Sequence, residues 1–285
     1  MMRCKTLVLL ATTAFTGFSS QANAAVMLAS AGDFAVLGGS TVTNTGVTVI
    51  SGGDVGVSPG TAITGFFAVD GGPGIITAPF TTHTGADAVA VQAHNDLISA
   101  YNAAQALPFL PANNLSGQDL GGLTLLPGVY RFNTSAFLTG TLTLDNMGDP
   151  NAEFVFQIGS TLITASNSSV VTINDNLIPE CNVFWQVGTS ATLGTNTAFQ
   201  GHILADQSIT LTTGASILEG SALAINAAVT LDTNRITNCV IPEPAAMNLV
   251  LIGGALLGIR RSCGGARSHS RMFSRSRVAR IMARG

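Results

Sequence analysis

The stretch that decides the fold, residues 182–237, reads NVFWQVGTSATLGTNTAFQGHILADQSITLTTGASILEGSALAINAAVTLDTNRIT. A Thr-Leu pair recurs in it, beginning at Thr192, Thr210 and Thr230. Two further pairs begin at Thr141 and Thr161, with a similar spacing. A repeat of roughly 20 residues is too short for a unit of paired helices and suits one coil of a β-solenoid.

Longer segments repeat as well. Residues 154–159 (FVFQIG) match residues 183–188 (VFWQVG) position by position. Residues 201–205 match residues 220–224 in the same way. These matches predict stacked coils that place equivalent side chains in one core.

Neighbouring side chains of a strand point to opposite faces, so the side chains around each repeated leucine can be sorted into inner and outer ones. The residues expected to be buried are Leu142, Leu162, Leu193, Leu211, Leu231, Phe156 and Trp185. The residues before the leucines form a first outer rank, which comprises Thr141, Thr161, Thr192, Thr210 and Thr230. The residues after them form a second, less regular rank, which comprises Thr143, Ile163, Gly194, Thr212 and Asp232. Ranks about 6.6–6.8 Å apart along a strand and about 4.8 Å apart between coils predict a flat, Thr-rich surface.

The same segments resemble a known family. FVFQIGSTL, CNVFWQVGTSATLGT, QGHILADQSITLTTGA and AVTLD are similar to the ice-binding β-solenoid family of bacteria, fungi and algae. Upstream, GDFAVLGGSTVTNTG, SGGDVGVSPG and LLPGVYRF fit the same pattern. The resemblance covers roughly residues 28–238.

The resemblance implies a fold that the residue pattern supports. We expect an all-β domain with one long helix: a discontinuous, right-handed, three-sided β-solenoid with the helix packed alongside. Residues 85–107 match the helix, because Val89, Ala93, Leu97, Tyr101 and Ala104 fall on one helical face, together with Ala100, and Pro108 ends the run. The N-terminal strands would then close against coils that come much later in the sequence.

The resemblance also implies a function, adsorption to ice. In the family, a flat face orders water into an ice-like layer that merges with the crystal. The predicted ice-binding residues are Thr141, Thr143, Thr161, Thr192, Thr210, Thr212 and Thr230. Outward threonine is also favoured on any solvated sheet, so a structural or adhesive protein of the cell surface or biofilm matrix is the alternative.

The two ends of the chain resemble export signals. Arg3 and Lys5, an apolar run at residues 7–18 and a small-residue cleavage site at residues 22–24 are typical of a signal peptide spanning residues 1–24. Pro242-Glu243-Pro244, the apolar residues 245–259 and two arginines resemble the PEP-CTERM sorting signal of Gram-negative bacteria, residues 242–261.

This C-terminal resemblance implies cleavage by an exosortase-type enzyme at Pro242-Glu243-Pro244 and transient contact with the inner membrane through residues 245–259. It further implies an extracellular or cell-surface destination in a Gram-negative bacterium. A basic Arg/Ser tail, residues 262–285, departs from the pattern, since such signals end soon after the arginines. Because the two predicted signals span residues 1–24 and 242–261, we expect the folded domain to occupy residues 25–241.

Charge and composition argue against other functions. Two arginines and fourteen carboxylates give residues 26–241 a formal charge of −12, which disfavours nucleic-acid binding. Solenoid polysaccharide lyases need clustered carboxylates and a basic catalytic residue, and no such set is present. We predict no enzyme activity, catalytic residue, cofactor or metal site. Asp145 and Asp149 are expected to bond turn amides, and His202 to occupy a turn or an edge.

Two cysteines remain in the domain, Cys181 and Cys239. In an oxidising compartment they either close the long loop between them as a disulfide or stay as two buried thiols.

Overall fold

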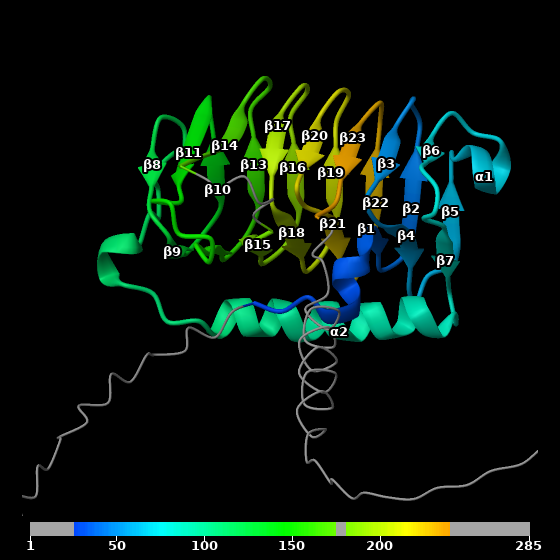
Figure 1. The fold of residues 1–285 in the computed structure, drawn as a ribbon, viewed down its shortest axis with the longest axis horizontal. Coiled ribbons are helices and arrows are strands. Elements are labelled where there is room, and N and C mark those ends of the chain that lie inside the picture. The colour runs from blue at the N-terminus through cyan, green and yellow to red at the C-terminus, as the bar shows by residue number, and fades with distance from the viewer. Residues whose placement is uncertain (1–25, 175–180, 240–285) are drawn as a thin grey trace, which may run out of the picture. The chain divides into compact units, whose positions relative to one another are not determined.

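Parallel β-strands make up most of the fold. The computed structural model describes residues 26–174 and 181–239. Figure 1 shows short strands stacked side by side in successive coils, with one long helix running alongside them. The predicted signal peptide, sorting signal and basic tail lie outside the described residues, so they stay predictions.

The strands form three sheets, described here in their spatial order. Sheet A contains β7 (Thr82–Thr84), β4 (Asp54–Val57), β1 (Phe34–Gly38), β21 (Ala222–Ala224), β18 (His202–Ala205), β15 (Val183–Val187), β12 (Phe154–Ile158) and β9 (Gly128–Phe132). Sheet B contains β10 (Ala136–Leu138), β13 (Leu162–Thr164), β16 (Ala191–Leu193), β19 (Ile209–Leu211), β22 (Val229–Leu231), β2 (Thr41–Asn44) and β5 (Ala62–Thr64). Sheet C contains β6 (Ile75–Ile76), β3 (Val49–Ser51), β23 (Arg235–Thr237), β20 (Ser216–Leu218), β17 (Ala198–Gln200), β14 (Ser169–Ile173), β11 (Thr141–Asp145) and β8 (Thr124–Leu125).

Helical segments are few in the described residues. They are η1 (Ala29–Asp33), α1 (Phe67–Asp70), α2 (Ala88–Ala106) and η2 (Pro111–Asn113). The short helix α1 lies at the β5–β6 end of the stack (Figure 1).

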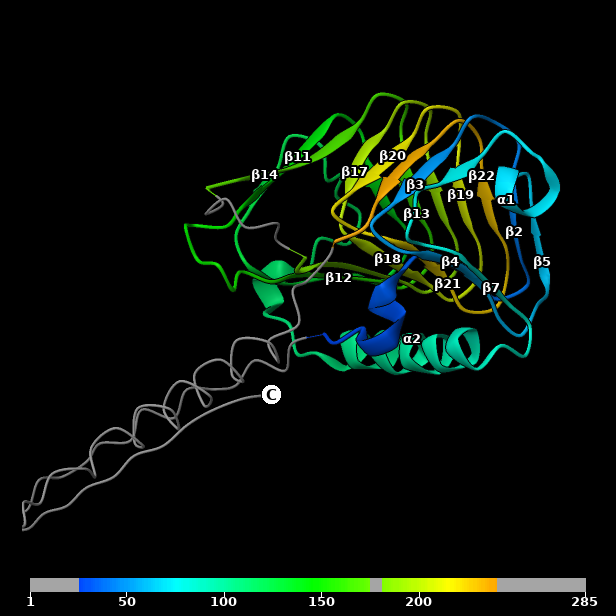
Figure 2. The ribbon, with the colours of Figure 1, turned by 45° about the vertical axis from the view of Figure 1, so that its right-hand side comes forward.

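The chain order within the sheets is discontinuous, as predicted. β1, β2 and β3 pair in parallel with β21, β22 and β23, so the N-terminal strands join the last coils. On their other side the same three strands pair with β4, β5 and β6. In Figure 2 these N-terminal strands lie directly beside the C-terminal ones.

The pairing confirms both repeats found in the sequence, because β12 pairs with β15 and β18 with β21 in the register of the matching segments. Coil length is not constant, however. Leu162 is level with Ala191, and Ala191 with Ile209, so the first of these two coils is much longer than the second. The long coils carry extra residues between β11 and β12 and between β14 and β15, whereas Gly201 alone separates β17 from β18.

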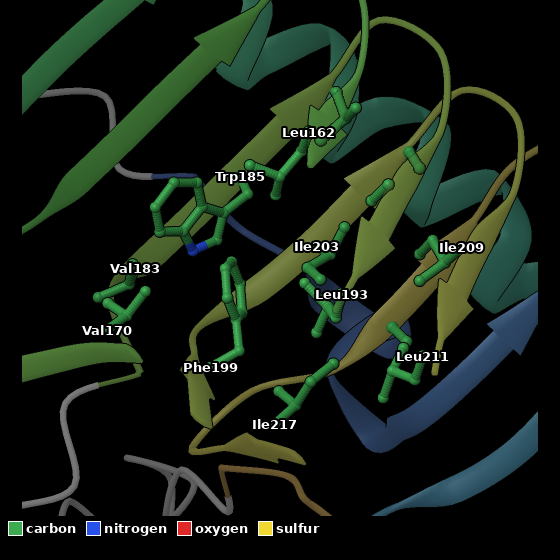
Figure 3. Close-up of a cluster of buried hydrophobic side chains, with 14 of the residues drawn as sticks. Leu162, Val170, Val183, Trp185, Leu193, Phe199, Ile203, Ile209, Leu211 and Ile217 are labelled. Carbon is green, nitrogen blue, oxygen red and sulfur yellow. The ribbon is translucent and has the colours of Figure 1, made fainter. Parts of the chain in front are cut away.

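The interior between the three sheets is the main hydrophobic core (Figure 3). All seven side chains predicted to be buried lie in it, each with an exposed fraction of 1% or less. The Trp185 ring stacks on Phe156 with centroids 3.9 Å apart, and its Nε1 donates a hydrogen bond to the Gln200 carbonyl at 3.0 Å. Burying each such side chain contributes about 1.5–3 kcal/mol, so every coil adds its own share of stability.

A second core lies on the outer face of sheet A. There Phe34, Leu37, Val155, Phe184, Leu204 and Leu223 pack against α2 and the segment around η1. Both faces of sheet A are therefore covered, which explains why its strands read as continuous apolar runs rather than alternating ones.

Helix α2 begins and ends where its sequence favours it. The Asp87 carboxylate accepts a hydrogen bond from the Val89 N–H, and Leu107 and Pro108 follow the last helical residue. The buried face includes Ala90 instead of the predicted Val89, which is exposed in the first turn. The buried Gln157 amide donates to the carbonyls of Ala104 and Leu107, both at 2.8 Å, and so satisfies acceptors that a helix end leaves open.

Cys181 and Cys239 form a disulfide, the first of the two alternatives that the sequence leaves open. Replacing both cysteines with alanine should lower the free energy of unfolding by about 3 kcal/mol, because the unfolded chain regains the freedom that the closed loop removes. Urea titration followed by the fluorescence of Trp185, the single tryptophan, measures this loss. Thiol titration of purified residues 25–241, which leave out Cys4 and Cys263, should find no free thiol, and two titratable thiols would contradict the disulfide.

His202 gives the fold a predicted dependence on pH. It lies buried in β18 rather than at the predicted turn or edge, and its Nδ1 is 2.8 Å from the Ser221 hydroxyl. Burial lowers the pKa of His202 from 6.5 to about 4, so the folded protein keeps a neutral ring. As pH falls from about 6.5 to 4, the unfolded chain binds a proton that the folded chain does not, and about 3 kcal/mol of stability is lost.

The measurement is the urea midpoint of the wild type and of His202→Gln at steps between pH 7 and pH 4. The variant should be less stable at pH 7 but should lose less stability on acidification. Parallel pH profiles for the two proteins would show that His202 does not cause the loss.

Candidate functional site

Sheets B and C are the two sheets with a free outer face. Their strands alternate buried and accessible residues, whereas α2 and the η1 segment cover sheet A. A binding surface made of regular strands therefore lies on sheet B or sheet C.

A column of threonines crosses the outer face of sheet B. Thr192 is level with Thr210, Thr210 with Thr230, Thr230 with Thr43, and Thr43 with Thr64, each on the next strand. We call these five residues the threonine column. Adjacent members are about 4.8 Å apart, the spacing of paired strands, so the column spans about 19 Å.

A flanking column of small residues runs beside it, two positions earlier on each strand. From β10 to β5 it comprises Ser135, Thr161, Ser190, Ser208, Ala228, Thr41 and Ala62. The two columns are about 6.6–6.8 Å apart along the strands, and neither contains a charged residue.

The hydroxyls of the two columns differ in their partners. In the flanking column, Ser135 and Thr161 share a hydrogen bond of 2.6 Å, and the Ser208 hydroxyl donates to that of Ser190 at 3.0 Å. Within residues 26–174 and 181–239, no hydroxyl of the threonine column bonds to another residue. These five hydroxyls are therefore available to water.

The structure corrects the prediction of one rank of five threonines. Thr192, Thr210 and Thr230 do share a column, but Thr161 lies in the flanking column, because Ile163 rather than Thr161 is level with Thr192. Thr141 lies on β11 of sheet C, level with Ser169. The step from Thr141 to Thr161 is shorter than the coil at this place, so the two Thr-Leu pairs belong to different sides of the coil.

The predicted second rank is also divided. Thr143 lies on sheet C, and Ile163 belongs to the line of the threonine column. Gly194, Thr212 and Asp232 follow the ends of β16, β19 and β22, where the chain turns toward sheet C. A Cβ at Gly194 would lie 2.6 Å from the Thr164 carbonyl oxygen, so only glycine lets the two coils approach here.

At this edge, side chains that the second rank was expected to present to the surroundings form hydrogen bonds within the protein instead. The Thr212 hydroxyl donates to the Leu193 carbonyl at 2.8 Å. The hydroxyls of Thr213 and Thr233 bond the Asp232 carboxylate and hold its pKa below the usual value. The charge of Asp232 is thus fixed at the rim, beside the threonine column rather than in it.

Sheet C has a less uniform outer face. The Thr141 hydroxyl is 2.8 Å from that of Ser169, and strands further along present Ala198, Leu218 and Arg235. Its side chains therefore differ in size, polarity and charge from coil to coil, unlike those of the threonine column.

The sequence reading missed Thr43 and Thr64. Neither is followed by leucine, since Asn44 and Gly65 come next, so a search for Thr-Leu pairs passes over both. The alternation in Thr41-Val42-Thr43 marks an outward Thr43, and this signal was available. Their place beside Thr230 depends on the pairing of β2 with β22, which no local pattern predicts.

The remaining candidate residues have structural partners. Asp145 and Asp149 accept hydrogen bonds from the Met147 and Asn151 N–H groups, as predicted for turns. The part of the chain that the structure describes contains no group of three His, Cys, Asp or Glu side chains placed to hold a metal ion. Nor does any helix there combine the length and the apolar character that a membrane span requires.

Comparison with known proteins gives a consistent result. The Ice-binding-like family model matches residues 36–237. An ice-binding protein of Nostoc sp. (strain HG1) is 52% identical over 263 residues, which cover 88% of this chain and 92% of the relative.

Two crystal structures of ice-binding proteins are similar, both with a TM-score of 0.67. One, from an Antarctic biological consortium, is 43% identical and aligns over 82% of this chain and 96% of its own. The other, from the Antarctic ascomycete Antarctomyces psychrotrophicus, is 40% identical and aligns over 76% of this chain and all of its own. The chain belongs to the ice-binding-like family.

Proposed function

We propose that the protein binds ice through the outer face of sheet B. The observation that carries the proposal is the threonine column: five level threonines, on adjacent strands, whose hydroxyls have no partner in the described residues. The family and the names of the relatives point to ice as the ligand.

The physical properties of this face suit a crystalline ligand. Threonine is β-branched and stiff at χ1, so it loses little rotamer freedom when it orders water. The backbone beneath is fixed by pairing on both sides and by the leucine core. Methyl groups and free hydroxyls recur together at about 4.8 Å, which favours a regular first layer of water that can merge with ice.

The finer predictions about fold and location belong to this proposal. We infer that the three sheets are the three sides of one right-handed solenoid. We infer further that residues 1–24 direct export, and that Pro242-Glu243-Pro244 is the point of cleavage by an exosortase-type enzyme. Transient contact of residues 245–259 with the inner membrane would then precede release to the outer surface or the medium.

The test is a Thr210→Tyr change in residues 25–241, which contain every residue of both cores. Thr210 lies near the middle of the threonine column, and an outward strand position accepts tyrosine at little cost in stability. The ring would stand above the face, and a rigid crystal cannot adapt to it. We expect a loss of most thermal hysteresis and of ice-recrystallisation inhibition, with a melting temperature within about 4 °C of the wild type.

The matched control is Thr143→Tyr. Thr143 also points outward from the middle of a strand and is also half-buried, but it lies on sheet C. It should keep wild-type activity. Equal activity of the two variants would contradict a role for sheet B, and a folded wild type without ice activity would favour the structural or adhesive alternative.

A further inference from the structure

The line of the threonine column continues beyond Thr192, but its chemistry changes. Ile163 is level with Thr192, and Phe137, on the first strand of sheet B, is level with Ile163. Both side chains are accessible, with exposed fractions of 38% for Ile163 and 49% for Phe137. Seven outward residues therefore share one line, of which five are threonines.

The two apolar residues differ in height above the sheet. Isoleucine has the branched Cβ of threonine with one further carbon, so it extends the surface with nearly the same profile. Phenylalanine carries a ring that stands well above its neighbours, because strand side chains project roughly perpendicular to the sheet. Phe137 is half exposed, so its neighbours do not cover the side chain.

The backbone leaves Phe137 little freedom to withdraw. β10 pairs with β13 on one side, and on the other the Leu120 N–H donates to the Phe137 carbonyl at 2.9 Å. Its inward neighbours Ala136 and Leu138 are buried in the main core. The strand is thus anchored on three sides, and the ring position follows from the backbone.

We propose that Phe137 sets the boundary of the docking area on sheet B. Its ring determines how large a patch of ice the face can contact. This inference rests on the proposed function. A flat crystal surface in contact with the threonine column meets the Phe137 ring at the β10 end. Docking therefore extends from Thr64 to Thr192 or Ile163 and stops there.

The experiment compares thermal hysteresis, at equal molar concentration, of the wild type, Phe137→Thr and the double variant Phe137→Thr/Ile163→Thr, all in residues 25–241. The double variant offers seven level threonines in place of five, so we expect activity to rise about 1.4-fold, in proportion to the length of the column. Leu218→Thr is the control, since Leu218 is 43% exposed on sheet C and the change should not affect activity.

Two further variants separate height from polarity. Phe137→Val removes the ring without adding a hydroxyl and should also raise activity. Ile163→Phe adds a second ring one strand closer to the threonine column and should lower activity. Circular dichroism and the melting temperature confirm that each variant is folded.

Unchanged or lower activity of folded Phe137→Thr and Phe137→Val would overturn the boundary. If Thr210→Tyr still abolished activity in the same experiment, sheet B would remain the docking face and only this inference would fail. A folded wild type without ice activity would overturn both proposals.

Discussion

The pairing of β1, β2 and β3 with β21, β22 and β23 is the constraint on which the rest of the structure depends. Thr43 and Thr230 become neighbours there although they lie near opposite ends of the folded chain. Closing so long a stretch of chain costs conformational entropy before any contact is gained. The two continuous cores and the disulfide between Cys181 and Cys239 offset that cost, and the threonine column exists because the joint keeps its register.

Much of the fold could be predicted because coils repeat their chemistry. The match of FVFQIG with VFWQVG reflects strands that are buried on both faces, and such positions accept few residue types. The limits of α2 could be predicted from apolar spacing, Asp87 and Pro108. The exposed Val89 could not, because Ala90, the next residue of the same turn, takes the buried position.

The candidate site could be predicted only in part, and the reason is geometric. A Thr-Leu pair shows that threonine points outward and leucine inward, but it does not show which side of the coil carries the pair. Where the coils are longer, as from Leu162 to Ala191, two residues separated by the length of a short coil lie on different sheets. Thr192, Thr210 and Thr230 were grouped correctly because the coils that link them are short and nearly equal in length.

Helix α2 and the η1 segment cover the outer face of sheet A, which limits how many crystals one molecule can bind. Of the three sheets, one is closed by its own chain, one has a mixed outer face with Arg235 and Leu218, and one carries the threonine column. A chain with a single regular face can attach to one crystal at a time. If sheet B is the docking face, as we propose, each molecule coats one crystal surface, and the helix-covered sheet A offers no second face that could bridge two crystals.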